Sequence, residues 1–246
     1  MIVNFSSYSS LGGRQNNEDS LLTYESGTSM LAVVADGLGG HADGEVASQT
    51  AIFSLAGALQ EKTVGIEALQ EAVQTAHSAV LAKQVETGSD MKTTIAAVWF
   101  GIETARGIHV GDSRIYHFRN DKILYQSMDH SLPQLDVLMG KITQDEIRGN
   151  IHQNCLTRVL GSGQNVRGDT VMLDVRDGDA LLLCTDGFWE LILEHEMIQA
   201  ANGTQSARTW LERMRQIVES RISDTGDNHT AIAIMIGQPC GGSEYV

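Results

Sequence analysis

Five aspartates at the ends of short apolar runs are the residues in this chain that are best suited to chemistry. They lie in the segments Asn17-Glu18-Asp19, Ala35-Asp36-Gly37, Gly111-Asp112-Ser113, Thr185-Asp186-Gly187 and Gly226-Asp227-Asn228. Apolar runs such as residues 31–35 and 181–184 are typical of buried strands, and an acid at the end of such a strand lies where the core meets water. Because carboxylates gathered at one place repel one another, such a site requires cations. Ligands that are all oxygen favour Mg²⁺ or Mn²⁺.

Arg14 precedes the first acidic pair, Glu18 and Asp19, and has two interpretations. In one, its guanidinium forms a structural ion pair with one of those carboxylates. In the other, it is a bidentate clamp for a phosphate held next to the metals. Two divalent ions about 3.5–4 Å apart can activate a water for in-line displacement at phosphorus, so this chemistry needs no side-chain nucleophile.

Composition limits the classes of partner. The chain has 246 residues, of which 42% are hydrophobic and 20% charged, and 31 acidic against 17 basic residues give a net charge of −14. That charge argues against nucleic acid or an anionic membrane as a partner. Cys155, Cys184 and Cys240 show neither metal-ligand spacing nor a paired pattern, which fits a reducing compartment. With no secretory signal and no apolar stretch near the roughly 20 residues of a spanning helix, we expect a cytoplasmic protein.

The elements that position the acids follow from periodicity. Alternating patterns predict strands over residues 20–24, 30–35, 93–101, 105–111, 114–119, 122–127, 171–175, 179–184 and 229–236. Helical patterns predict long helices over residues 45–60, 66–84 and 206–222, and short ones over 132–139 and 143–147. The Arg176-Asp177-Gly178 turn predicts a hairpin. Many antiparallel strands with helices in separate blocks indicate an α+β fold whose sheets are covered by helices.

Seven motifs occur in an order that matches one family. They are Arg14-Gln15-Asn16-Asn17-Glu18-Asp19-Ser20, Ala35-Asp36-Gly37-Leu38-Gly39-Gly40-His41 with Gly44-Glu45-Val46-Ala47-Ser48, Gly111-Asp112-Ser113-Arg114, Asp129-His130-Ser131, Leu156-Thr157-Arg158-Val159-Leu160-Gly161, Thr185-Asp186-Gly187 and Asp227-Asn228. Each motif alone is weak, but the series is specific. From about residue 4 to 236 the chain strongly resembles the protein phosphatase 2C (metal-dependent protein phosphatase) family in its compact bacterial form.

The resemblance implies a fold and a domain plan. The fold would be a four-layer α-β-β-α sandwich, with a central antiparallel β-sandwich and helices on both outer faces. Residues 1–237 would form one phosphatase domain, in which 129–167 are the flap, a variable element over the site that affects substrate choice. Residues 238–246 would be a short flexible tail, and we expect a monomer.

The resemblance also implies roles for the acids. Asp36 would bridge two Mn²⁺ or Mg²⁺ ions, with the Gly37 carbonyl as a further ligand. Glu18 would hold the second metal through water, with Asp19 in the same acidic cluster. Asp186 and Asp227 would bind the first metal. Asp112 would form a third, weaker site together with Asp186. Arg14 would bind the substrate phosphate. Arg14 and Asp36 would be the catalytic residues.

Four positions depart from the family pattern or stay open. Leu38 stands where many animal members have a histidine thought to act as general acid, so the proton donor is unassigned. His41 is either a substitute donor or the cap of a turn. Lys92 replaces the usual glycine of Gly-Thr-Thr, which either costs backbone freedom or adds a phosphate-friendly charge. His130 either pins the flap or is an ordinary buried histidine.

The implied activity is hydrolysis of phosphoserine and phosphothreonine on proteins by in-line attack of a metal-bound hydroxide. Phosphorylated proteins would be the substrates, and a Ser/Thr protein kinase would be the functional opponent. One alternative is a catalytically inactive phospho-protein-binding member of the fold; against it, Asp36, Asp186 and Asp227 are all retained. A second is a hydrolase of small phosphoesters.

Overall fold

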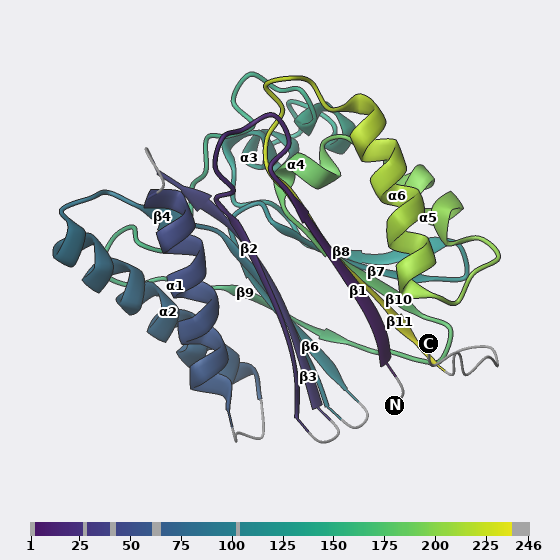
Figure 1. Cartoon of the computed structure of the whole chain (residues 1–246), viewed down its shortest axis with the longest axis horizontal. Coiled ribbons are helices and arrows are strands. Elements are labelled where there is room, and N and C mark those ends of the chain that lie inside the picture. Colours follow the sequence, from purple (N-terminus) through teal and green to yellow (C-terminus); the bar gives the residue numbers. More distant parts are fainter. Residues whose placement is uncertain (1–2, 27–28, 40–42, 61–64, 102–103, 238–246) are drawn as a thin grey trace.

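Two antiparallel sheets lie face to face at the centre of the molecule, and helices cover both outer faces (Figure 1). The computed structural model describes residues 3–26, 29–39, 43–60, 65–101 and 104–237. The first sheet has the order β1 (Val3–Ser10), β11 (His229–Ile236), β10 (Ala180–Cys184), β7 (Arg114–Arg119) and β8 (Lys122–Gln126). The second has the order β2 (Asp19–Ser26), β3 (Ser29–Leu38), β5 (Ile95–Phe100), β6 (Ala105–Val110) and β9 (Asp169–Leu173), and the short β4 (Lys92–Thr93) pairs with the end of β3.

The helices form the two outer layers. The long helices α1 (Asp43–Leu59) and α2 (Ile66–Thr87) pack on the second sheet. The helices α4 (Asp186–Trp189), α5 (Glu194–Ala201) and α6 (Ala207–Arg221) pack on the first. The short helix α3 (Leu132–Leu138) and a 3₁₀ turn over Gln144–Ile147 belong to the segment predicted as the flap. The four-layer α-β-β-α arrangement predicted from the sequence is confirmed.

Strand β3 shows why the central strands are apolar throughout. Leu31, Val33 and Ala35 pack against the helices of the second sheet. The alternate residues, including Ala32 and Val34, pack against the other sheet. Because both faces of the strand are covered, both sets must be apolar, and the period-two pattern disappears into a continuous run.

The predicted hairpin at Arg176-Asp177-Gly178 is wrong. The chain does reverse there, because Asp179 Oδ2 accepts the Arg176 N–H at 2.9 Å and Gly178 has a φ of +90°. However, β9 pairs with β6 in one sheet, whereas β10 pairs with β7 and β11 in the other. Turn chemistry specifies the reversal, and the neighbouring strands decide which sheet each arm joins.

Other boundaries differ in detail. The strand predicted over residues 93–101 is divided at Thr94 into β4 and β5. The sequence reasoning missed β1, α4 and α5. The predicted tail 238–246, like Gly40 and His41, lies outside the described residues. In the described part of the chain, no helix combines the length and apolar character needed to cross a bilayer.

Candidate metal and phosphate site

The strand ends that carry the predicted acids meet at one end of the sandwich. Asp19 begins β2 and lies directly opposite Asp36 near the end of β3. Asp112 follows β6, Asp186 begins α4 directly after β10, and Asp227 lies just before β11. A cavity of about 460 Å³ opens among them, lined by Arg14, Gln15, Asn16, Glu18, Asp36, Gly37, Leu38, Gly39, Asp112, Asn154, Leu156, Asp186, Asp227 and Asn228. The structure therefore gathers every predicted site residue around one cavity, with Asp19 behind the lining residues.

The backbone of Asp36 is fixed by two threonines at the β4–β5 junction. Thr94 Oγ1 accepts the Asp36 N–H at 2.9 Å, and the Thr94 N–H donates to the Asp36 carbonyl at 2.9 Å. The Thr93 hydroxyl donates to the same carbonyl at 2.8 Å. These contacts use only main-chain atoms of Asp36, so its carboxylate is left for the cavity.

Two glycines allow the acidic segments to approach helix α1. A Cβ on Gly37 would overlap the Gly44 carbonyl, and a Cβ on Gly44 would lie 2.5 Å from Glu18 Oε2. The Glu18 carboxylate thus rests against the first turn of α1. Its backbone is held from the far end of the chain, because the Glu18 N–H donates to Asn228 Oδ1 at 2.8 Å. Only glycine fits these contacts, which explains the Asp-Gly pattern at Gly37.

Lys92 does not need the conformational freedom of the glycine that the family pattern places there. It is a β4 strand residue paired with Leu38, outside the positive-φ positions. Its ammonium donates to Asp90 Oδ2 at 2.7 Å. The lysine charge is therefore already engaged at the surface.

The buried acids have few compensating contacts. The Thr185 hydroxyl donates to Asp19 Oδ2 at 2.8 Å, and the Gly187 N–H donates to Asp186 Oδ1 at 2.6 Å. Asp112 Oδ1 is buried with no hydrogen-bond partner among the described residues. An unpartnered carboxylate oxygen in the core is costly unless a cation or water meets it.

The pKa values of these acids also reflect burial and the repulsion between carboxylates. Burial, together with the charges of Asp186 and other acids, raises the pKa of Asp36 well above its usual value. Burial raises the pKa of Asp112 in the same way, with the charge of Asp186 as the next cause. Burial and neighbouring charges raise the pKa of Asp19 to about 8 and that of Asp186 to about 6. Divalent cations would relieve this repulsion, and the oxygen-only donor set fits Mn²⁺ or Mg²⁺.

Arg14 forms an ion pair, but with neither of the acids that are near it in sequence. Its Nη2 lies 2.9 Å from Asp227 Oδ2, and about half of each side chain is exposed, 54% and 41%. The contact uses one nitrogen of the guanidinium at the rim of the cavity. Arg14 is therefore adjacent to the acid cluster and accessible to a ligand that enters it.

A buried cation supports the turn that carries Asp112. Arg114 donates to both oxygens of Asp129, at 2.8 and 2.7 Å, and its Cζ lies 3.4 Å from the centre of the Trp189 ring. The Trp189 indole in turn donates to the Asp112 carbonyl at 3.0 Å. The sequence analysis missed this support. Its only signal is the Arg of Gly-Asp-Ser-Arg together with Asp129 at the start of the flap segment.

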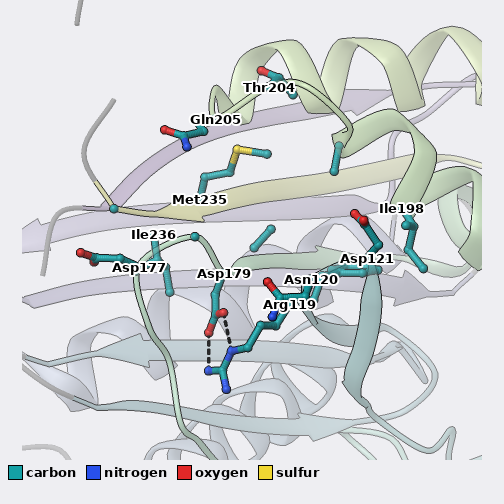
Figure 2. A pocket seen from close by; sticks show the side chains of 15 residues that line it. Arg119, Asn120, Asp121, Asp177, Asp179, Ile198, Thr204, Gln205, Met235 and Ile236 are labelled. Carbon is teal, nitrogen blue, oxygen red and sulfur yellow. Dashed lines mark hydrogen bonds and ion pairs between the residues drawn. The ribbon is translucent and has the colours of Figure 1, made fainter. Parts of the chain in front are cut away.

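The opposite end of the same strands provides a contrast. A cavity of about 410 Å³ there is lined by residues that include Arg119, Asp179 and Met235 (Figure 2). Asp179 accepts from Arg119 Nε and Nη2 at 2.7 and 2.8 Å, and His117 Nε2 lies 2.7 Å from it. Although burial acts to raise it, these hydrogen bonds lower the pKa of Asp179. Asp179 is therefore ion-paired, whereas Asp36, Asp112 and Asp186 form no ion pair with a described residue.

A second group of metal-type side chains lies beside the acid cavity. Ligand atoms of His109, His130 and Asp169 are within 4.8 Å of one another. Arg158 lies against this group, with its Nη1 2.6 Å from Asp169 Oδ1 and 2.9 Å from His130 Nε2.

A family model described as protein phosphatase 2C matches residues 8–226. The chain belongs to the protein phosphatase 2C family. The serine/threonine protein phosphatase PstP of Mycobacterium tuberculosis is 32% identical over 226 residues, which cover 90% of this chain. The serine/threonine phosphatase stp of Listeria innocua is 29% identical over 231 residues, which cover 90% of each chain. This chain spans 42% of the length of the M. tuberculosis protein.

A solved structure extends the likeness to the fold and to the metals. It is the catalytic domain of PstP in complex with two manganese ions, and it matches 96% of this chain and 99% of its own with a TM-score of 0.82 and 30% identity. The α+β sandwich is thus the protein phosphatase 2C fold. A relative of this similarity holds two manganese ions, as the acid cluster of the present chain would require.

Proposed function

We propose that this chain is a Mn²⁺- or Mg²⁺-dependent protein phosphatase that hydrolyses phosphoserine and phosphothreonine in proteins. The observation that carries the proposal is the cavity at which Glu18, Asp36, Asp112, Asp186 and Asp227 meet, where Asp112 Oδ1 has no hydrogen-bond partner among the described residues. Five chain segments far apart in sequence supply these acids. Membership of the protein phosphatase 2C family and the names of its relatives support the same activity.

The proposed ligands follow from the cavity. Asp36 would hold both main ions, with the Gly37 carbonyl as a further ligand, and Asp186 and Asp227 would complete the first site. Glu18 would act on the second ion through water, with Asp19 behind it, and Asp112 would join Asp186 at a third, weaker site. When bound, divalent ions of this kind lower the pKa of a coordinated water and offset charge that develops on phosphoryl oxygens.

Arg14 would receive the phosphoryl group. Its guanidinium is charged at any physiological pH and presents paired N–H groups that match two phosphate oxygens. Because the pair with Asp227 is half exposed, exchanging it for a doubly charged phosphate costs little. Arg14 and Asp36 are the proposed catalytic residues. Leu38 lines the cavity without a titratable group, so the proton for the departing serine or threonine oxygen comes from elsewhere.

Residues 129–167 are proposed as the flap of a phosphatase domain that spans residues 1–237. Asn154 and Leu156 from this segment line the acid cavity. Leu138 and Met139 in the same segment are exposed, at 65% and 66%. Exposed apolar side chains in the segment that also supplies cavity residues suit a protein substrate, because they can contact residues near the phosphorylated one. The opposing partner would be a cytoplasmic Ser/Thr kinase that makes such substrates.

The direct test measures phosphate release from a phosphothreonine peptide and from its phosphotyrosine counterpart, with Mn²⁺ and with a chelator. The proposal predicts Mn²⁺-dependent release from the phosphothreonine peptide and little from the phosphotyrosine one. Release that persists in the chelator would contradict the metal requirement. If the protein hydrolysed p-nitrophenyl phosphate but released phosphate from neither peptide, the result would favour a small-phosphoester hydrolase.

A further inference from the structure

His130 forms two hydrogen bonds with Gly111, the residue that precedes Asp112. Its backbone N–H donates to the Gly111 carbonyl at 2.9 Å, and its Nδ1 accepts the Gly111 N–H at 3.0 Å. Gly111 has a φ of +102°, so it holds a turn that residues with a side chain rarely adopt. The backbone and the side chain of the buried His130 therefore each form one hydrogen bond that fixes the turn into Asp112.

The other nitrogen of His130 is held by a separate pair of residues. Because Nδ1 accepts an N–H, the proton of the neutral ring is on Nε2. That Nε2 lies 3.3 Å from Asp169 Oδ2, which can accept its proton. Arg158 donates to the other Asp169 oxygen at 2.6 Å. Arg158 Nη1 also lies 2.9 Å from Nε2, but a neutral ring accepts at one nitrogen only. With the Gly111 N–H on Nδ1, the Nε2 proton is directed to Asp169, and Arg158 contacts Nε2 without a hydrogen bond.

His109 fixes the plane of the same ring. The two imidazoles are stacked, with centroids 4.7 Å apart and planes 10° apart, and His109 Nε2 lies 2.8 Å from the Met128 carbonyl. His109 is 2% exposed. The ring of His130 therefore has contacts on its face and on both nitrogens.

These contacts argue against a metal ion held by His109, His130 and Asp169. A metal bound to His130 Nε2 would move the ring proton to Nδ1, where it would face the Gly111 N–H. Lone pairs of two parallel imidazoles also run parallel and do not converge on one ion. The Arg158 guanidinium, 2.9 Å from Nε2, adds a positive charge at the point where a cation would bind.

We propose that His130 is a positioning residue for Asp112, and that through this residue of the flap the acid is linked to the rest of the flap. The link to the flap runs through the His130 carbonyl, which accepts the Thr157 N–H at 2.8 Å next to the cavity residue Leu156. Since Asp112 is a proposed ligand of the weaker cation site, the inference rests on the proposed function. Groups that orient metal ligands in this way typically change metal affinity 10–100-fold when they are removed.

The test compares His130→Asn, His130→Gln and His130→Ala by calorimetric titration of the whole chain with Mn²⁺, without substrate. An Asn side chain places its Oδ1 near the position of Nδ1 and can accept the Gly111 N–H, whereas Gln and Ala cannot. We expect His130→Gln and His130→Ala to weaken the weakest Mn²⁺ site by about tenfold or more. His130→Asn should bind Mn²⁺ close to the wild-type affinity. Melting temperatures of all variants report the structural cost separately.

His77 provides a matched control. Its Nδ1 accepts the N–H of another positive-φ glycine, Gly161, at 3.2 Å, on the α2 side of the molecule. His77→Gln removes the same kind of bond, so it should lower the melting temperature while leaving Mn²⁺ binding unchanged. Asp112→Asn identifies which binding step belongs to the weaker site.

The outcomes separate this inference from the proposed function. If wild-type protein binds no Mn²⁺, the proposed function fails first. If wild type binds Mn²⁺ and His130→Gln binds it equally well, only the inference is overturned. Histidine ¹⁵N NMR of the wild type needs no variant, since the inference predicts the Nε2–H tautomer for His130 and an Nδ1–H tautomer would overturn it.

Discussion

Asp186→Asn should make the metal-free protein more stable while it removes a proposed metal ligand. Burial and the charge of Asp227 raise the pKa of Asp186 from 3.8 to about 6. Two pKa units correspond to about 3 kcal/mol, an upper limit because neighbouring acids titrate together. Asn carries no charge, and its Oδ1 can still accept the Gly187 N–H.

The pH dependence follows from the direction of that shift. Because the pKa of Asp186 is higher in the folded than in the unfolded protein, its stabilising contribution is complete below about pH 3.8 and is lost as the pH rises through about 6. The variant has no such loss. In a chelator, its advantage over wild type at pH 5 should be about half of its advantage at pH 8. At pH 8, up to about 3 kcal/mol corresponds to roughly 6–12 °C in melting temperature for a chain of this size.

Thermal unfolding followed by circular dichroism, in chelator and in Mn²⁺, measures this. Mn²⁺ should raise the melting temperature of wild type more than that of the variant, which keeps the proposed ligands of the second ion, and this difference should reverse their order. Asp179→Asn is the control, since the pKa of Asp179 is lowered and the substitution removes the carboxylate that accepts two hydrogen bonds from Arg119. It should destabilise the protein with or without metal. A metal-free Asp186→Asn protein that is less stable than wild type at pH 8 would refute the reasoning.

Three further predictions concern the same end of the molecule. Arg14→Ala should raise KM for a phosphothreonine peptide by about tenfold or more, the worth of a hydrogen bond to a charged group, with Arg14→Lys intermediate; an unchanged KM in steady-state assays would leave only the ion pair with Asp227. A chelator should stop phosphate release and added Mn²⁺ should restore it, and activity that survives exhaustive chelation would contradict the ligand assignment. Arg114→Met should lower the free energy of unfolding by about 3–5 kcal/mol, because the buried Asp129 loses its counter-charge; a smaller loss in urea unfolding would show that this ion pair contributes little to stability.

The fold could be predicted where apolar runs are covered on both faces. Strand β11 and strand β7 were predicted with their observed bounds, because their patterns are continuous and end at polar turns. Strand β1 was missed because Ser6, Ser7 and Ser9 weaken its apolar pattern at the edge of the sheet. An edge strand needs fewer apolar residues, so its sequence carries less signal.

The residues of the candidate site could be predicted, but their partners could not. Acids at strand ends are visible in sequence, and the structure gathers them around one cavity, while their individual roles stay predictions. The ion pair of Arg14 joins it to Asp227 at the other end of the chain, and no sequence pattern favours that acid over Glu18. The hydrogen bond from Gly111 to His130 depends on the tautomer of the imidazole and on the turn at Gly111, and both are defined only in the folded chain.

The most direct test of the account is anomalous diffraction at the manganese edge from crystals grown in Mn²⁺. The account predicts peaks among Asp36, Asp186 and Asp227, with any weaker peak beside Asp112. A map with no peak at these acids, or with its strongest peak between His109 and Asp169, would contradict it.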